Sequence, residues 1–286
     1  MSSSKLEWFI AQGSEFNWST QPFARTIKSM IDTEFHEWGF IIYRCSYGDD
    51  EAWRRYMKYF EENVLDGLEH HGGDWVVGDP LAHSQLIPEC IELMDHVCTK
   101  LPQYAKWTVR EDRETLDGAS IDAVRDMFAQ WRDEHSVERK PHWTRQLVPP
   151  MARDPPMRLP RFTYCLYVDQ KCLNTVNAFA ESFPRPNRSA PEPPPLVAAL
   201  IDGDFDEGQY VRGGPRATPD ERGEFPAVDG RTCGYVGWEY VDTNGLGCVY
   251  EALHDLRLDD PMDYKRPPKI SPLGYEILTD DGVQRV

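Results

Sequence analysis

The chain has 286 residues, enough for one large domain or two small ones, and 40% of them are hydrophobic against 28% charged, as in globular proteins. The formal net charge of −17 argues against nucleic acid or an anionic membrane as a partner, because phosphate groups would be repelled at long range. No apolar run approaches the ~20 residues that cross a bilayer.

The first residues and the cysteines predict a cytoplasmic protein. The N-terminus lacks the apolar segment of a secretion signal. The seven cysteines are dispersed along the chain and include no Cys-x-x-Cys pair. Such a set is typical of reduced thiols that serve as small apolar side chains.

The clearest strand covers residues 39–47. Five of the six residues from Phe40 to Cys45 are apolar or aromatic, which predicts an inner strand covered on both faces. Gly48 ends this run, and Asp49 or Asp50 is placed to cap the next helix.

Apolar spacing predicts helices over residues 22–33, 50–69, 84–101 and 120–131. Residues 137–160 then form a connector that is rich in proline and carries net positive charge, where regular structure is not expected. This connector either lies across an acidic face of the same protein or binds a partner.

The second half repeats a short pattern. Tyr167-Val168-Asp169-x-x-x-Leu173-x-x-Val176 matches Tyr240-Val241-Asp242-x-x-x-Leu246-x-x-Val249, and each copy resembles a strand, an aspartate cap and a helix. A third strand is predicted at 196–201. Two long loops, the proline-rich 184–195 and the acidic 203–233, are of a length that is usually functional or disordered.

These elements predict an α+β protein with one central sheet of about four strands. A ferredoxin-like βαββα half would supply three strands, and residues 39–47 would supply the fourth. We expect residues 1–286 to form a single domain, with a mainly helical half at 1–136, the connector at 137–160, and the βαββα half at 161–286.

Asp169 and Asp242 would meet at one edge of a ferredoxin-like sheet. Paired carboxylates at strand ends can hold a divalent metal for phosphoryl transfer. The alternative is that each side chain caps the helix that follows it, which is the more common role. Helix capping by Asp169 and Asp242 requires no metal.

Arg44 and Glu239 are charged residues inside otherwise apolar strands, so each must be paired or solvated. If the two strands are neighbours, the two side chains form either a structural ion pair or part of a ligand pocket in which Arg44 binds an anion. The candidate ligand-binding residues are Arg44, Tyr43, Tyr47, Tyr167, Trp238 and Glu239.

The run Gly39-Phe40-x-Ile42-Tyr43-Arg44-x-x-Tyr47, the acidic start of the helix that holds Trp53, and the run from Tyr164 to Asp169 carry a family resemblance. Together they resemble a group of uncharacterised proteins of filamentous fungi, over most of the chain. The resemblance implies an intracellular fungal protein, and implies no activity or functional residue.

Three functions remain open from the sequence. The first is a cytosolic small-molecule-binding protein, or a metal-independent enzyme of specialised metabolism, with an aromatic pocket that contains Arg44. The second is a non-catalytic module that binds other proteins through its proline-rich loops. The third is a metal-dependent phosphoryl-transfer enzyme that uses Asp169 and Asp242. No cofactor is expected, because the chain has no Gly-x-Gly-x-x-Gly, Walker or Gly-x-Ser-x-Gly sequence.

Overall fold

The described part of the chain is built around one mixed sheet. The computed structural model describes residues 23–74, 99–137, 159–184, 194–211, 225–260, 264–271, 275–277 and 283–285. Within these ranges eight strands form a sheet in the order β2-β1-β3-β4-β5-β6-β7-β8. The strands are β1 (Ile41–Arg44), β2 (Thr108–Arg110), β3 (Tyr164–Val168), β4 (Val197–Asp202), β5 (Trp238–Asp242), β6 (Lys269–Ser271), β7 (Tyr275–Ile277) and β8 (Val283–Arg285).

Helices surround this sheet. The described α-helices are α2 (Ala24–Thr33), α3 (Asp50–Asp74), α6 (Arg113–Leu116), α7 (Ile121–His135), α9 (Gln170–Ser182), α10 (Glu207–Val211) and α11 (Leu246–Ala252). Short 3₁₀ turns are η2 (Leu101–Tyr104), η4 (Pro160–Phe162) and η6 (Thr243–Gly245). The helices expected at 22–33, 50–69 and 120–131 are therefore confirmed, since their apolar stripes lie in the core.

The expected number of strands is wrong, because the sheet has eight strands instead of about four. The strands that the sequence did not predict, β2, β6, β7 and β8, have three residues each. A segment of three residues is too short to show an alternating pattern, and each of these strands is identified by its pairing with a neighbour. The interior position of residues 39–47 is confirmed, because β1 lies between β2 and β3.

The ferredoxin-like arrangement is not formed. In that arrangement the two strands joined by a helix run parallel with another strand between them. Here α9 joins β3 to β4, which are adjacent and antiparallel, and β4 separates β3 from β5. The first and last strands of the repeated pattern are therefore not neighbours.

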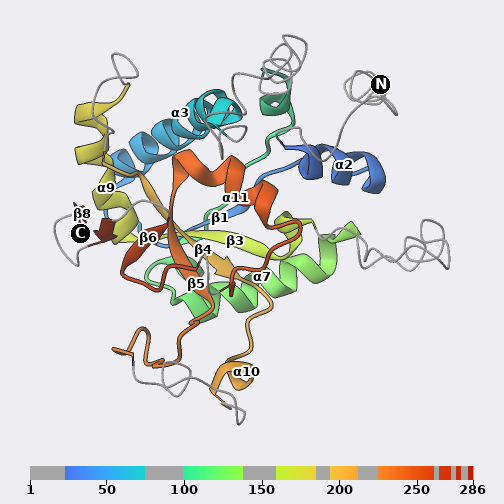
Figure 1. Ribbon diagram of the computed structural model, residues 1–286. Coiled ribbons are helices and arrows are strands. Elements are labelled where there is room, and N and C mark those ends of the chain that lie inside the picture. Colours follow the sequence, from blue (N-terminus) through green and yellow to red (C-terminus); the bar gives the residue numbers. More distant parts are fainter. Residues whose placement is uncertain are drawn as a thin grey trace.

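The two faces of the sheet carry different helices. Figure 1 shows α3 and α11 on one side of the sheet and α7 on the other. Helix α7 packs on β3 and β4, and α3 packs on α9 and α11. Successive residues of a strand point to opposite faces, so Tyr43 and Tyr167, paired across β1 and β3, point to one face, and Arg44 points to the other.

Both halves of the sequence contribute to one apolar core. Fully buried side chains include Trp38 and Phe40 from the first half and Tyr250 from the second. The ring of Tyr250 packs edge-on against Phe40 at 5.1 Å and against Trp38 at 5.6 Å. No helix in the described ranges combines the length and apolar character of a membrane span.

Several predicted segments lie outside the described residues. These are most of the helix at 84–101, positions 138–158 of the connector, positions 185–193 of the proline-rich loop and positions 212–224 of the acidic loop.

Candidate functional site

The six candidate residues are divided between the two faces of the sheet. Tyr43 and Tyr167 lie side by side on the α7 face. Trp238 is in register with Ile201, which pairs with Cys165, and this places its side chain on the same face. The residues that follow Tyr43 and Trp238, which are Arg44 and Glu239, therefore point to the α3 face.

Arg44 is held by residues close to it in sequence and by Glu111, which follows β2. Its guanidinium forms an ion pair with Asp50, approaches Glu111 at 3.8 Å, and donates from Nε to the Ser46 carbonyl at 3.0 Å. It also lies over the ring of Tyr47, with its carbon 4.3 Å from the ring centroid. This cluster brings together two of the candidate residues, Arg44 and Tyr47.

The expected ion pair between Arg44 and Glu239 is wrong. Strands β3 and β4 lie between β1 and β5, so the two side chains are separated by two strands. Glu239 is 4% exposed, and its carboxylate accepts a hydrogen bond of 2.8 Å from the backbone N–H of Lys265. Arg44 and Glu239 therefore each bind a different partner, Asp50 for Arg44 and the Lys265 N–H for Glu239.

Asp169 and Asp242 are helix caps. The carboxylate of Asp169 accepts from Cys172 N at 3.0 Å, and that of Asp242 accepts from Asn244 N at 3.2 Å. Strand β4 separates their strands, so the paired arrangement expected for a metal site is absent. The described residues contain no group of three or more His, Cys, Asp or Glu side chains placed to hold a metal ion.

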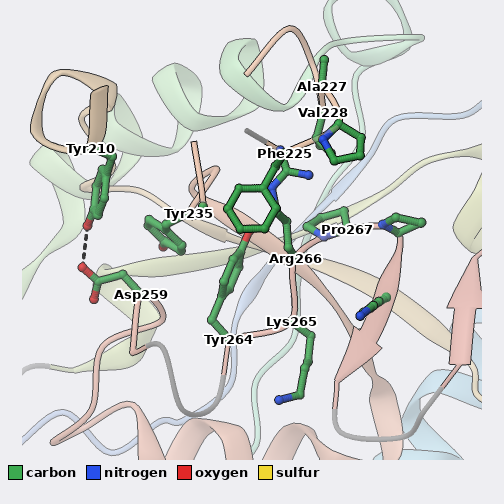
Figure 2. A pocket seen from close by; sticks show the side chains of 14 residues that line it. Tyr210, Phe225, Ala227, Val228, Tyr235, Asp259, Tyr264, Lys265, Arg266 and Pro267 are labelled. Carbon is green, nitrogen blue, oxygen red and sulfur yellow. Dashed lines mark hydrogen bonds between the residues drawn. The ribbon is translucent and has the colours of Figure 1, made fainter. Parts of the chain in front are cut away.

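The structure shows a cleft at the end of the sheet where β5 begins. It has a volume of about 920 Å³ and lies between residues 225–235 and residues 259–269. Aromatic rings surround it (Figure 2). They belong to Tyr210, Phe225, Tyr235 and Tyr264.

A tight hairpin turn begins at Val228, one of the residues that line the cleft. Val228 and Arg231 exchange two backbone hydrogen bonds of 2.9 Å around Asp229-Gly230. Both central residues have positive φ, 49° and 80°, the combination that favours Asp-Gly in a two-residue hairpin loop. The sequence of the turn therefore determines where the chain reverses.

Arginine contacts hold this hairpin against α7. Arg231 donates to Asp122 of α7 at 2.7 Å and to Glu207 of α10 at 3.2 Å. The guanidinium carbons of Arg231 and Arg125 lie 5.4 Å and 4.9 Å from the ring centroid of Phe205. The Phe205 ring and the Asp122 carboxylate, which also pairs with Arg125, together fix the hairpin relative to α7.

The tyrosines of the cleft are neutral donors. Tyr235 donates to the buried Asp202 at 2.8 Å, and Tyr210 donates to Asp259 at 2.5 Å. Burial, reinforced by these carboxylates, raises the pKa of both phenols. Burial likewise raises the pKa of Tyr264, whose oxygen accepts from Val236 N and donates to the Trp238 carbonyl.

Comparison with known proteins gives no relative. No protein-family model matches the chain, and neither a curated protein nor a solved structure is significantly similar to it.

None of the six candidate residues lines the cleft. Glu239 and Trp238 lie next to it, since both bond to residues 264–265 of its wall. The sequence did carry one signal for the site, the Asp229-Gly230 turn within the long loop 203–233. The turn alone could not predict a cleft, because the opposite wall includes Tyr264 and Arg266, which come more than thirty positions later.

Proposed function

We propose that this is a cytoplasmic protein that binds a small organic molecule in the cleft between residues 225–235 and 259–269. The observation that carries the proposal is an open cleft of about 920 Å³ with four aromatic side chains in its walls. Small-molecule sites in proteins typically occupy ~300–1,000 Å³ and are lined mainly by apolar and aromatic groups.

The chemistry of the walls favours binding over catalysis. The pKa values of the lining phenols of Tyr210, Tyr235 and Tyr264 are all raised, so none of them is prepared to act as a base near neutral pH. The thiol of Cys233 donates to the Tyr235 carbonyl at 3.0 Å, and burial raises its pKa as well. A nucleophile with a lowered pKa is what covalent catalysis would require.

The cytoplasmic location is supported by the thiols. In the part of the chain that the structure describes, Cys45, Cys165, Cys172 and Cys233 are free thiols. Unpaired thiols are typical of a reducing compartment. A fungal origin, implied by the resemblance of the Gly39–Tyr47 run, stays a prediction.

Phosphoryl transfer through Asp169 and Asp242 is not supported by the position of either carboxylate. Binding of partners through the proline-rich loop stays a prediction, because residues 185–193 lie outside the described ranges.

A thermal-shift screen against metabolites tests the proposal. Compounds that raise the melting temperature of the wild type are measured again with Ala227→Trp, which places a bulky ring at an exposed lining position of the cleft. We expect the shift to disappear in this variant and to persist in Glu61→Trp, which adds the same ring to the exposed surface of α3. A shift of equal size in both variants would place the ligand elsewhere.

A further inference from the structure

The charges around the cleft differ from those of the whole chain. The net charge of the protein is −17, yet the charged residues that line the cleft are three cations and one carboxylate. They are Lys265, Arg266, Lys269 and Asp259. This local excess of positive charge is what an anionic ligand requires.

The one carboxylate is already partnered. Asp259 accepts a hydrogen bond from the Tyr210 hydroxyl at 2.5 Å and pairs with Arg257 at 3.2 Å. Its charge is therefore compensated within its own side of the cleft. It does not neutralise the three cations.

Arg266 is fixed in place while its positive charge stays uncompensated. It donates from Nε to the Cys233 carbonyl at 3.1 Å and from Nη2 to the Arg231 carbonyl at 3.0 Å. Both acceptors are neutral, and Nη1 donates to none of the described residues. The guanidinium also lies over the ring of Phe225, 5.1 Å from its centroid (Figure 2).

The lysines contribute further positive charge. Neither Lys265 nor Lys269 forms an ion pair or a side-chain hydrogen bond with any residue that the structure describes. Figure 2 shows the Lys265 side chain directed away from the rings. Lys269 begins β6, in register with Glu276 of β7, and its side chain is exposed. Lys269 is therefore the better placed of the two to meet a ligand within the cleft.

We propose that the ligand is an aromatic organic acid whose ring packs among Phe225, Tyr235 and Tyr264, with its acidic group bound by Arg266 and Lys269. Rings stack or meet edge-on at separations like the 4.9 Å between Tyr235 and Tyr264. A guanidinium already oriented by two carbonyls loses little freedom when it binds an anion. This inference rests on the proposed function and adds the chemical class of the ligand.

Two fluorescent probes that share a ring system test the inference. Anilinonaphthalene sulfonate carries a sulfonate, and phenylnaphthylamine is the same molecule without it. We expect the full-length protein to bind the anionic probe at least about tenfold more tightly, with an affinity that falls as salt is added, whereas the neutral probe is insensitive to salt.

Charge-removing variants locate the anion. Lys269→Met should weaken binding of the anionic probe by about fivefold and leave the neutral probe within about twofold. Lys265→Met removes a charge that also lines the cleft but is directed away from the rings, and should weaken the anionic probe less than Lys269→Met does, whereas the remote Lys58→Met should change either affinity less than about twofold. Arg266 is left intact, because its loss would also remove its hydrogen bonds to the Cys233 and Arg231 carbonyls. Unchanged melting temperatures confirm that the variants fold.

The two proposals fail in different ways. If both probes bind equally and Lys269→Met changes neither, the assignment of an acid is overturned while the cleft remains a binding site. If Lys265→Met weakens the anionic probe as much as Lys269→Met does, the direct contact with Lys269 is wrong. If neither probe binds, or if Ala227→Trp leaves both affinities unchanged, the proposed function itself is overturned.

Discussion

The carboxylate of Glu239 binds the backbone N–H of Lys265 at 2.8 Å, and this contact ties the buried strand β5 to the wall of the cleft. A charged residue inside an apolar strand thus serves to position a neighbouring segment. The same wall receives a second bond from β5, since Tyr264 donates to the Trp238 carbonyl at 3.2 Å. Strand β5 and the wall of the cleft are therefore joined by these two hydrogen bonds.

Glu239→Ala should destabilise the protein and loosen this wall. Because the Lys265 N–H loses its acceptor, we expect a loss of about 2–3 kcal/mol in the free energy of unfolding. Glu239→Gln keeps an acceptor oxygen and should lose less. Chemical denaturation measures both variants, and faster hydrogen exchange in 264–269 would report the local effect; equal losses would show that the bond to Lys265 is not what matters.

Arg44→Met should cost less than a broken buried ion pair. The carboxylates left behind, on Asp50 and Glu111, have side chains that are 71% and 47% exposed and can be solvated by water. We expect a loss of about 1 kcal/mol, mainly from the guanidinium contacts with the Tyr47 and Trp53 rings, instead of the ~3–5 kcal/mol typical of an orphaned buried charge.

The same variant has a second readout. The hydrogen bond from Arg44 and its positive charge lower the pKa of Asp50 below 3.8. In Arg44→Met this pKa should rise toward the ordinary value, as followed by NMR titration of the carboxyl carbon. An unchanged pKa would mean that the two side chains do not pair in solution.

Gly67→Ala should disrupt the contact between α3 and η6. A Cβ atom at Gly67 would lie 1.9 Å from the backbone oxygen of Asn244, and backbone cannot yield as a flexible side chain can. We expect a loss of about 3 kcal/mol or more in the free energy of unfolding. Gly245 has nothing within 4 Å of the same added atom, so Gly245→Ala is the matched control and should stay within about 0.5 kcal/mol of wild type. Similar melting temperatures for the two variants would contradict this packing.

Asp202 should make stability depend on pH. Burial raises its pKa above the ordinary 3.8, against the opposing bonds from Asp204 N and the Tyr235 hydroxyl. The folded state therefore binds the proton more tightly than the unfolded chain, so this carboxyl costs stability as pH rises from 3.8 through the folded pKa. Asp202→Asn does not lose stability in this way, because an amide side chain does not ionise.

The free energy of unfolding of Asp202→Asn relative to wild type should accordingly increase between about pH 4 and pH 7. Denaturation curves at several pH values measure the difference. A difference that is constant with pH would show that the pKa of Asp202 is the same in both states.

Local features were readable from the sequence. The apolar stripes of α3 and α7 and the caps formed by Asp169 and Ser120 involve residues within a few positions of one another. The strands β1, β3, β4 and β5 were also evident, because a strand covered on both faces is mostly apolar along its length. Such patterns depend only on burial and on the period of the backbone.

The arrangement of these elements was decided by contacts between distant residues. The first turn of α2 is bound by a carboxylate far along the chain: Glu251 accepts from Arg25 N and Thr26 N, both at 2.9 Å. Strand order, the three-residue strands and the cleft between Phe225 and Tyr264 depend on similar long-range pairing. The sequence by itself therefore determined which segments are helical, extended or buried, because that information is local. Only the tertiary structure decided which segments meet, because contact free energies between remote residues leave no periodic trace along the chain.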